Sequence, residues 1–292
     1  MMESQFAHTD VVVIGGGMAG LSAACYLARA GKDVTLFEKA SGLGGRAATQ
    51  KYDEYCFNRG GHALYTGGAA SAVFQELGIT YSYGIPKKVF ALQQGRFYAF
   101  PASFSTLLRT DLLDGSGKLA LMRLFIALPR LKPHEIASMS VQEWLERTIK
   151  HPQVHQMMTA FARTVTYSAA LDLVSAELLI ARLQQAFRNP VQYIDGGWQT
   201  LVDALRRAAE QAGVHIVSGT RVETVAHDNG HVEGVYLHDG SFVHASGVVI
   251  ATSPQDATRL VDDGNNAALQ RTVDAIVPVQ IACLDVALSS LP

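Results

Sequence analysis

A short apolar run, Val-Val-Val-Ile at residues 11–14, leads directly into a turn that is rich in glycine. A helical pattern of small and apolar residues follows over 21–30, and a second apolar run over 34–37 ends at Glu38. Strand, tight turn, helix, strand and acid come in the order that a dinucleotide-binding βαβ unit requires. The sequence therefore predicts a parallel α/β unit that binds a dinucleotide; the alternative is that the glycines belong to an ordinary structural turn.

Each glycine of this turn has its own physical reason. Gly15 permits the sharp turn, Gly17 lets the backbone approach a pyrophosphate, and Gly20 lets the helix pack closely on the sheet. The helix N-terminus offers unpaired N–H groups and a partial positive charge to the phosphates. Glu38 lies about 20 residues further on, where it can accept hydrogen bonds from a ribose. The candidate dinucleotide-binding residues are Gly15, Gly17, Met18, Ala19, Gly20, Glu38 and Lys39.

A second glycine loop, Gly-Leu-Gly-Gly-Arg at residues 42–46, follows the acid. Gly44 and Gly45 can run close along a diphosphate, and Arg46 can pair with it as a fork-shaped cation. At this point the sequence resembles the FAD-dependent amine oxidase, protoporphyrinogen oxidase and phytoene desaturase superfamily, whose members carry a Gly-Gly-Arg loop after the ribose acid. The resemblance implies FAD as the cofactor, because folds that bind only NAD do not need this second loop.

A third segment, residues 57–64, is similar to the short strand and turn that lie beside the flavin ring in that superfamily. The resemblance implies that Gly60, Gly61 and His62 lie near the ring, and that His62 can contact the flavin or the substrate. The superfamily more often has an acid where Asn58 stands, which leaves the role of Asn58 open. A packed or exposed histidine without a direct role is the alternative for His62.

A fourth segment begins at Tyr-Ile-Asp-Gly-Gly-Trp, residues 193–198, and continues into leucines at helical spacing and a valine-rich run at 221–225. The superfamily shows the same order, and the resemblance implies that Val222 backs the adenine through its main chain. It also implies that the run 248–252 is a sheet strand that returns to the cofactor phosphates, which adds Ala251 to the candidate residues.

The function that the resemblance implies is the transfer of a hydride equivalent from a small molecule to flavin N5. The substrate would be an amine or an apolar, unsaturated compound, held in a mostly apolar pocket lined by a helical insert over residues 90–187. Two alternatives are a flavin-binding protein without redox turnover, such as an isomerase or a structural subunit, and an inactive truncated fragment. We assign no catalytic acid or base.

At 292 residues the chain is long enough for two domains. The expected fold class is α/β, a Rossmann-like FAD-binding domain with an inserted, largely helical substrate domain of α+β type. Superfamily members continue for roughly another domain, so we expect truncation within the substrate domain. We expect the FAD-binding domain to comprise two stretches of chain, 1–84 and 190–262, separated by the substrate domain over 85–189. The remaining residues, 263–292, should begin a return to the substrate domain.

Local patterns predict most of the individual elements. A helix over 69–77 should end at Gly78, which suits a left-handed C-cap. Turn residues predict a hairpin over 90–100 and a three-stranded meander over 221–245. The apolar alternation at 279–288 predicts a further strand. Apolar residues spaced by three and four predict helices over 119–128, 141–149, 154–165 and 176–187.

Composition limits the partners. A net charge of −2 argues against nucleic acid, which needs a basic face. Three cysteines without C-x-x-C spacing suit a reducing, cytoplasmic compartment. His151 and His155 lack the context of a metal motif, so no metal is expected. The apolar stretch at 119–126 could contact a membrane surface peripherally, but it is too short to span one. The expected partner is an apolar or amine small molecule, and nothing in the sequence indicates the oligomeric state.

Overall fold

The βαβ unit forms as the glycine pattern predicts. The computed structural model, which describes residues 8–288, places β1 (His8–Ile14), α1 (Met18–Arg29) and β2 (Val34–Glu38) in succession. The two strands are parallel, with Val11 opposite Val34. Val12, Val13 and Leu36 are fully buried, as expected for a parallel sheet that is covered on both faces.

The main sheet has six strands in the order β10-β2-β1-β13-β12-β11. β10 (His215–Ser218), β2, β1 and β13 (Phe242–Ile250) run parallel, and β13, β12 (His231–Leu237) and β11 (Val222–Asp228) form an antiparallel meander. The prediction of the meander is confirmed. Its third strand continues through the run that begins at 248, so the meander and the returning parallel strand share β13.

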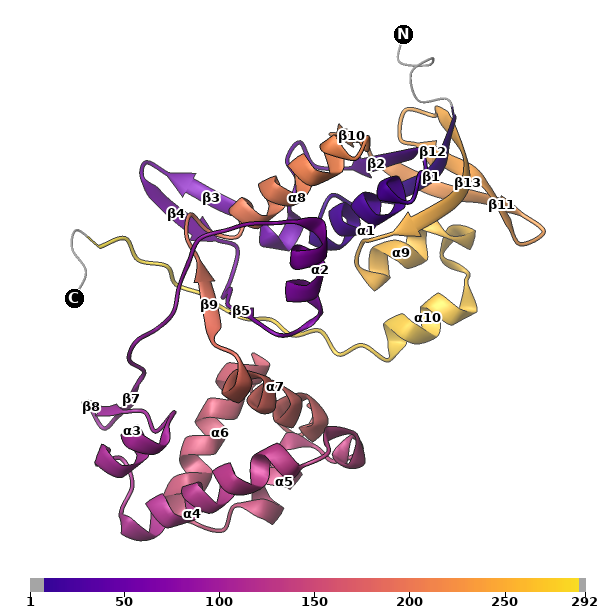
Figure 1. Ribbon diagram of the computed structural model, residues 1–292. Coiled ribbons are helices and arrows are strands. Elements are labelled where there is room, and N and C mark those ends of the chain that lie inside the picture. The colour runs from indigo at the N-terminus through magenta and orange to yellow at the C-terminus, as the bar shows by residue number, and fades with distance from the viewer. Residues whose placement is uncertain (1–7, 289–292) are drawn as a thin grey trace.

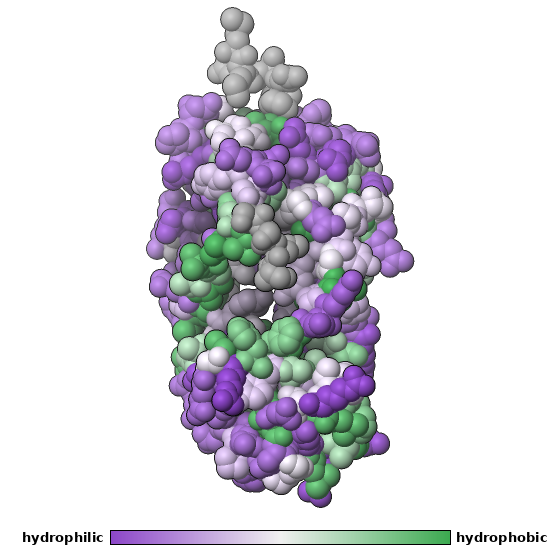
Figure 2. Space-filling model, turned by 90° about the vertical axis from the view of Figure 1, so that its left-hand side faces the viewer, coloured by the Kyte–Doolittle hydropathy of each residue, from purple (hydrophilic) through white to green (hydrophobic). Residues whose placement is uncertain are grey.

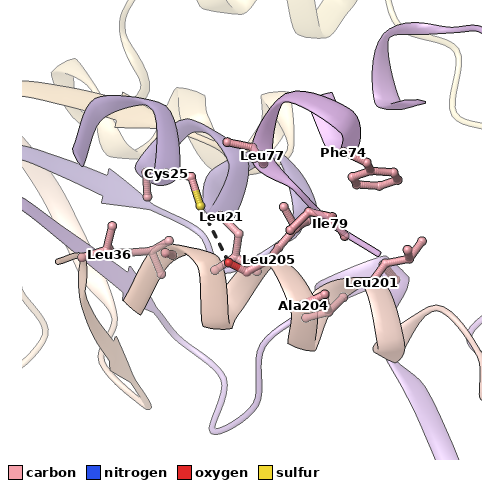
Figure 3. Close-up of a cluster of buried hydrophobic side chains, with 14 of the residues drawn as sticks. Leu21, Cys25, Leu36, Phe74, Leu77, Ile79, Leu201, Ala204 and Leu205 are labelled. Atoms are coloured by element: carbon pink, nitrogen blue, oxygen red, sulfur yellow. Dashed lines mark hydrogen bonds between the residues drawn. The ribbon is translucent and has the colours of Figure 1, made fainter. Parts of the chain in front are cut away.

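A hydrophobic cluster joins the parallel strands to three helices (Figure 3). Side chains of α1, α2 (Ala69–Leu77) and α8 (Gln199–Gln211) meet there, and the Cys25 thiol, which is fully buried, donates to the carbonyl oxygen of Leu205 at 3.7 Å. As predicted, α2 ends at Gly78, whose φ of +74° is the left-handed region that favours glycine. A second cluster packs the meander against α9 (Pro254–Leu260), which is followed by α10 (Ala267–Asp274).

The helices of the insert gather at the lower end of the molecule in Figure 1. They have a hydrophobic core of their own, which contains Trp144 and Ile180. The strand that precedes the insert, β6 (Tyr83–Gly84), and the strand that follows it, β9 (Val191–Ile194), pair with each other, and β5 (Leu64–Tyr65) pairs with β9 from the other side. The hairpin and the four helices agree with prediction; the domain boundaries remain predictions. The hairpin is formed by β7 (Phe90–Gln93) and β8 (Arg96–Ala99). After α3 (Phe104–Arg109) come the four helices that match the predicted ones: α4 (Gly115–Ala127), α5 (Val141–Thr148), α6 (Pro152–Thr166) and α7 (Ala176–Arg188).

The strand predicted over 279–288 is wrong. The described residues after α10 form no helix or strand. They run as an extended trace between the helical insert and the part of the molecule built on the main sheet, which we call the sheet domain (Figure 1). Leu284 is 88% exposed. An alternating apolar pattern becomes a strand only where another strand supplies hydrogen bonds, and none does so for this segment within residues 8–288.

The surface differs along the molecule. In the view of Figure 2, hydrophilic side chains dominate the upper end, and hydrophobic ones gather toward the middle and the lower part. Phe90, Leu92 and Phe97 of the β7–β8 hairpin are among the exposed large apolar residues. Contact with a membrane surface stays a prediction. None of the helices between residues 8 and 288 combines the length and the apolar composition needed to cross a membrane.

Candidate functional site

The three glycines of the first turn meet different surroundings. Gly15 has a φ of +110°, and a Cβ there would lie 2.8 Å from the carbonyl oxygen of Ala251. A Cβ on Gly20 would lie 1.9 Å from the carbonyl oxygen of Gly15. A Cβ on Gly17 would meet only the Gly44 oxygen, at 4.0 Å. The fold itself thus requires glycine at positions 15 and 20, whereas the space beside Gly17 is free for a ligand.

Glu38 at the end of β2 returns to this turn. One carboxylate oxygen accepts from the N–H of Gly16 at 2.6 Å, and the other accepts from the N–H of Ala40 at 2.8 Å. The acid is therefore held at the glycine turn by main-chain donors, and its contact with a ribose stays a prediction. Lys39 is exposed and forms an ion pair with Asp256 of α9 at 3.5 Å.

The second glycine loop is joined to the first. The N–H of Gly44 donates to the carbonyl oxygen of Gly16 at 2.8 Å, and Gly44 forms a parallel bridge with Gly17. Gly44 has a φ of +113° and packs against Val202 of α8. A short 3₁₀ turn, Gly45–Ala47, then presents Arg46, whose exposed guanidinium has no partner among the described residues. The loop that carries Arg46 is therefore bound to the turn that begins α1 through Gly44, and the role of Arg46 toward a phosphate stays a prediction.

His62 connects the second loop to the third segment. Its Nδ1 lies 2.8 Å from the Gly60 carbonyl oxygen, and its Nε2 lies 3.0 Å from the Arg46 carbonyl oxygen. A neutral imidazole has one N–H, so it donates to one of these carbonyls at a time. Gly60 has a φ of +112°, and Gly61 is exposed next to it. His62 thus joins the loop at Arg46 to the segment at Gly60 through hydrogen bonds of its ring.

Trp198, at the N-terminus of α8, belongs to the same place and was not among the predicted site residues. Its indole ring lies 4.7 Å from the His62 imidazole, centroid to centroid. The indole nitrogen is buried and has no hydrogen-bond partner among the described residues. Buried indole N–H groups normally have an acceptor. The only sequence signal was its position directly after Gly196 and Gly197.

Asn58 has a structural role that the sequence left open. Its Oδ1 accepts from the Thr49 hydroxyl at 2.7 Å and from the N–H of Trp198 at 3.0 Å. Thr49 in turn accepts from the N–H of Gln199 at 3.0 Å. These residues belong to the β3–β4 hairpin, β3 (Thr49–Tyr52) and β4 (Tyr55–Asn58), and they satisfy the first N–H groups of α8. An acceptor oxygen is all that this position needs, and an acid would supply it equally.

Val222 and Ala251 complete the predicted set. Ala251 follows β13, and its N–H donates to the carbonyl oxygen of Ile14 at 2.8 Å. Val222 begins β11 and is buried; just before it, the N–H of Thr220 donates to the carbonyl oxygen of Glu38 at 3.0 Å. The predicted residues therefore converge beyond the carboxyl ends of the parallel strands, where open α/β sheets bind their ligands. Their roles toward a cofactor stay predictions.

Two other expectations concern the insert and metals. The helical insert contains a cavity of about 120 Å³ whose lining side chains are all apolar and include Phe100, Met157 and Phe161. The Nε2 atom of His151 contacts the Ser116 hydroxyl and the Asp114 carboxylate. Within residues 8–288, no three His, Cys, Asp or Glu side chains are grouped so that they could hold a metal ion.

The residues fit a dinucleotide with a second, ring-bearing end. Three features could serve such a ligand: the space at Gly17, the exposed and unpaired Arg46 guanidinium, and the buried Trp198 indole N–H, which has no acceptor among the described residues. A diphosphate suits the first two, because helix N–H groups and a guanidinium both bind anions. The third is a buried donor between the His62 ring and the hydrophobic cluster, which suits a flat heterocycle that has acceptor atoms.

Comparison with known proteins gives consistent matches. The sequence model of the family described as flavin containing amine oxidoreductase matches residues 18–279. The 4,4'-diaponeurosporene oxygenase of Staphylococcus aureus is 24% identical over 274 residues, which cover 82% of this chain and 54% of that protein. The phytoene desaturase of Cercospora nicotianae is 26% identical over 288 residues, 85% of this chain and 46% of the other. The chain thus spans about half the length of these curated relatives.

Solved structures share the fold. The crystal structure of an oxidoreductase from Methanosarcina mazei superimposes with a TM-score of 0.74 at 21% identity, covering 91% of this chain and 65% of that one. The predicted α/β fold class is confirmed by this similarity and by the strand order of the main sheet.

Proposed function

The chain belongs to the flavin containing amine oxidoreductase family, and we propose that it binds FAD and forms the cofactor-binding portion of an oxidoreductase that acts on a small molecule. The observation that carries the proposal is the junction of the two glycine loops at Gly17 and Gly44. The junction brings the main chain of the second loop, two residues before Arg46, against the turn that begins α1, which supports a role for Arg46 toward the diphosphate. A single-loop NAD site has no use for such an arrangement.

The proposed cofactor lies along the carboxyl edge of the sheet. Glu38 and the main chain at Val222 hold the adenosine end, the N–H groups at Gly17 to Ala19 and Arg46 hold the diphosphate, and Gly60 to His62 face the ring. Main-chain donors of the partly buried first turn bind phosphate more strongly than they would in water, and the exposed guanidinium adds a charge-assisted contact. The chemistry that FAD would supply in this site is acceptance of a hydride equivalent at flavin N5, with dioxygen or another acceptor to reoxidise it.

The substrate that we propose is mainly apolar and unsaturated. Two observations favour it over a small amine: the cavity lined by apolar side chains in the helical insert and the similarity to proteins named as a desaturase and an oxygenase. The protein's role is to bind such a substrate away from water and to orient it; no side chain among residues 8–288 is assigned a proton-transfer role.

The test is to identify the cofactor that copurifies with the chain. Heat release followed by mass spectrometry should yield FAD, and the folded protein should show the flavin absorption bands. Recovery of NAD and no flavin from well-folded protein would contradict the proposal. Anaerobic bleaching of the flavin by apolar polyenes, with amines as the matched comparison, then separates the two substrate classes.

A further inference from the structure

A half-buried cation without an acidic partner lies where the helical insert meets the sheet domain. The guanidinium carbon of Arg182, on α7, stands 5.1 Å from the centroid of the Tyr65 ring, which belongs to β5. Among residues 8–288, no carboxylate forms an ion pair or a hydrogen bond with Arg182. Partial burial of a guanidinium costs free energy, and a cation–π contact offsets only some of that cost. Its N–H donors remain available.

Two further phenols belong to the same cluster. Tyr167 closes α6 with a φ of +54°, and Tyr193 lies on β9 directly after the insert. Burial raises the pKa of the Tyr65 and Tyr167 phenols, and their phenol neighbours add to this, whereas Arg182 opposes it. The hydroxyls therefore keep their protons at neutral pH and can donate hydrogen bonds. Tyr167 and Tyr193 are 41% and 51% exposed, so a ligand can reach the cluster from solvent.

The cluster is adjacent to the proposed ring end of the cofactor. A Cβ on Gly61 would lie 3.5 Å from Cε1 of Tyr167. Tyr65 follows His62 within the same short segment that ends in β5. Donors from a guanidinium and from phenols thus border the place where a substrate would contact the flavin, and no described acidic group neutralises them.

We propose that Arg182, together with Tyr65 and Tyr167, binds a carboxylate carried by the substrate. This inference rests on the proposed function, because it takes Gly61 to face the flavin. A planar carboxylate matches the fork of a guanidinium with two parallel hydrogen bonds, and a phenol can supply a third. The substrate is then an apolar compound with an acidic end. A cationic alkylamine is disfavoured, because its ammonium would face Arg182.

The test uses the FAD-loaded chain and three probes of equal chain length: octanoate, octylamine and octanol. Calorimetric titration should show octanoate binding about tenfold or more tightly than the other two, as a charge-assisted bidentate contact implies. Arg182→Gln should remove this preference. Arg188→Gln, the same charge change at an exposed position on α7, should leave it intact.

Arg182→Lys and Tyr167→Phe guard against a variant that fails to fold. The lysine keeps the charge but lacks the fork, and the phenylalanine removes one donor, so each should weaken octanoate binding several-fold and leave octanol binding unchanged. A chain that takes up FAD but binds octanoate no more tightly than octanol overturns this inference alone. A chain that takes up no flavin, and whose flavin-free form still prefers octanoate through Arg182, overturns the proposed function instead.

Discussion

The carbonyl oxygen of Gly15 lies only 1.9 Å from the position that a Cβ on Gly20 would occupy. The first turn of α1 is therefore pressed against the loop that precedes it. The Gly20→Ala variant should lose about 1–3 kcal/mol of unfolding free energy, because either the loop or the helix must move. Urea denaturation measures this loss.

Gly17→Ala is the matched control in the same turn. A Cβ there meets nothing closer than 4.0 Å, so stability should be nearly unchanged. The added methyl group would instead stand in the space assigned to the diphosphate, and FAD affinity should fall. Equal stability losses in the two variants would show that the two glycines do not have separate roles.

Glu38→Ala should weaken FAD binding by about tenfold to a hundredfold, because a lost charge-assisted hydrogen bond is worth roughly 1.5–3 kcal/mol. The carboxylate also accepts from the N–H groups of Gly16 and Ala40. Glu38→Gln keeps one acceptor oxygen for the loop and should separate loop order from ribose binding. An unchanged FAD dissociation constant in both variants would show that Glu38 does not contact the cofactor.

Asn58→Leu should destabilise the protein by about 1–2 kcal/mol, because the N-terminus of α8 loses an acceptor. Asn58→Asp keeps an oxygen toward the Thr49 hydroxyl and the N–H of Trp198 and should be close to the parent in stability. Urea denaturation of both variants checks this. A leucine variant as stable as the parent would mean that the hydrogen bonds of Asn58 contribute nothing to α8.

Trp198 reports on the ring end of the site. It lies against His62, whereas Trp144 is buried in the core of the helical insert. With Trp144→Phe, which leaves Trp198 as the emitter, FAD should quench tryptophan fluorescence more strongly than with Trp198→Phe. Flavin quenching is strongest for rings in contact. Equal quenching in the two variants would place the flavin away from Trp198.

The elements that could be predicted from the sequence are those whose formation depends on residues close together in the chain. The βαβ unit, the Gly78 helix end and the hairpin at 90–100 each follow from patterns within a few turns of chain. The strand expected at 279–288 failed for the opposite reason, since a strand exists only with a partner and the pattern cannot supply one.

The site contacts that were missed are all long-range. Asn58 and Trp198 are 140 positions apart, and Arg182 meets Tyr65 only because β5 and the helical insert come together. Nothing near Asn58 in the sequence indicates that it receives the N–H groups of a distant helix. By contrast, the two glycine loops could be placed together in advance, because both follow the carboxyl ends of adjacent parallel strands.

The most direct measurement of the central claim is a calorimetric titration of flavin-free protein with FAD, NAD and FMN, repeated with Arg46→Gln. FAD should bind at least about tenfold more tightly than NAD, which lacks the flavin ring that we assign to Gly60 to His62, and than FMN, which lacks the adenosine end. Arg46→Gln should weaken the binding of FAD, because the guanidinium is assigned to its diphosphate. NAD binding as tight as FAD, or a folded chain that binds neither dinucleotide, would contradict the account.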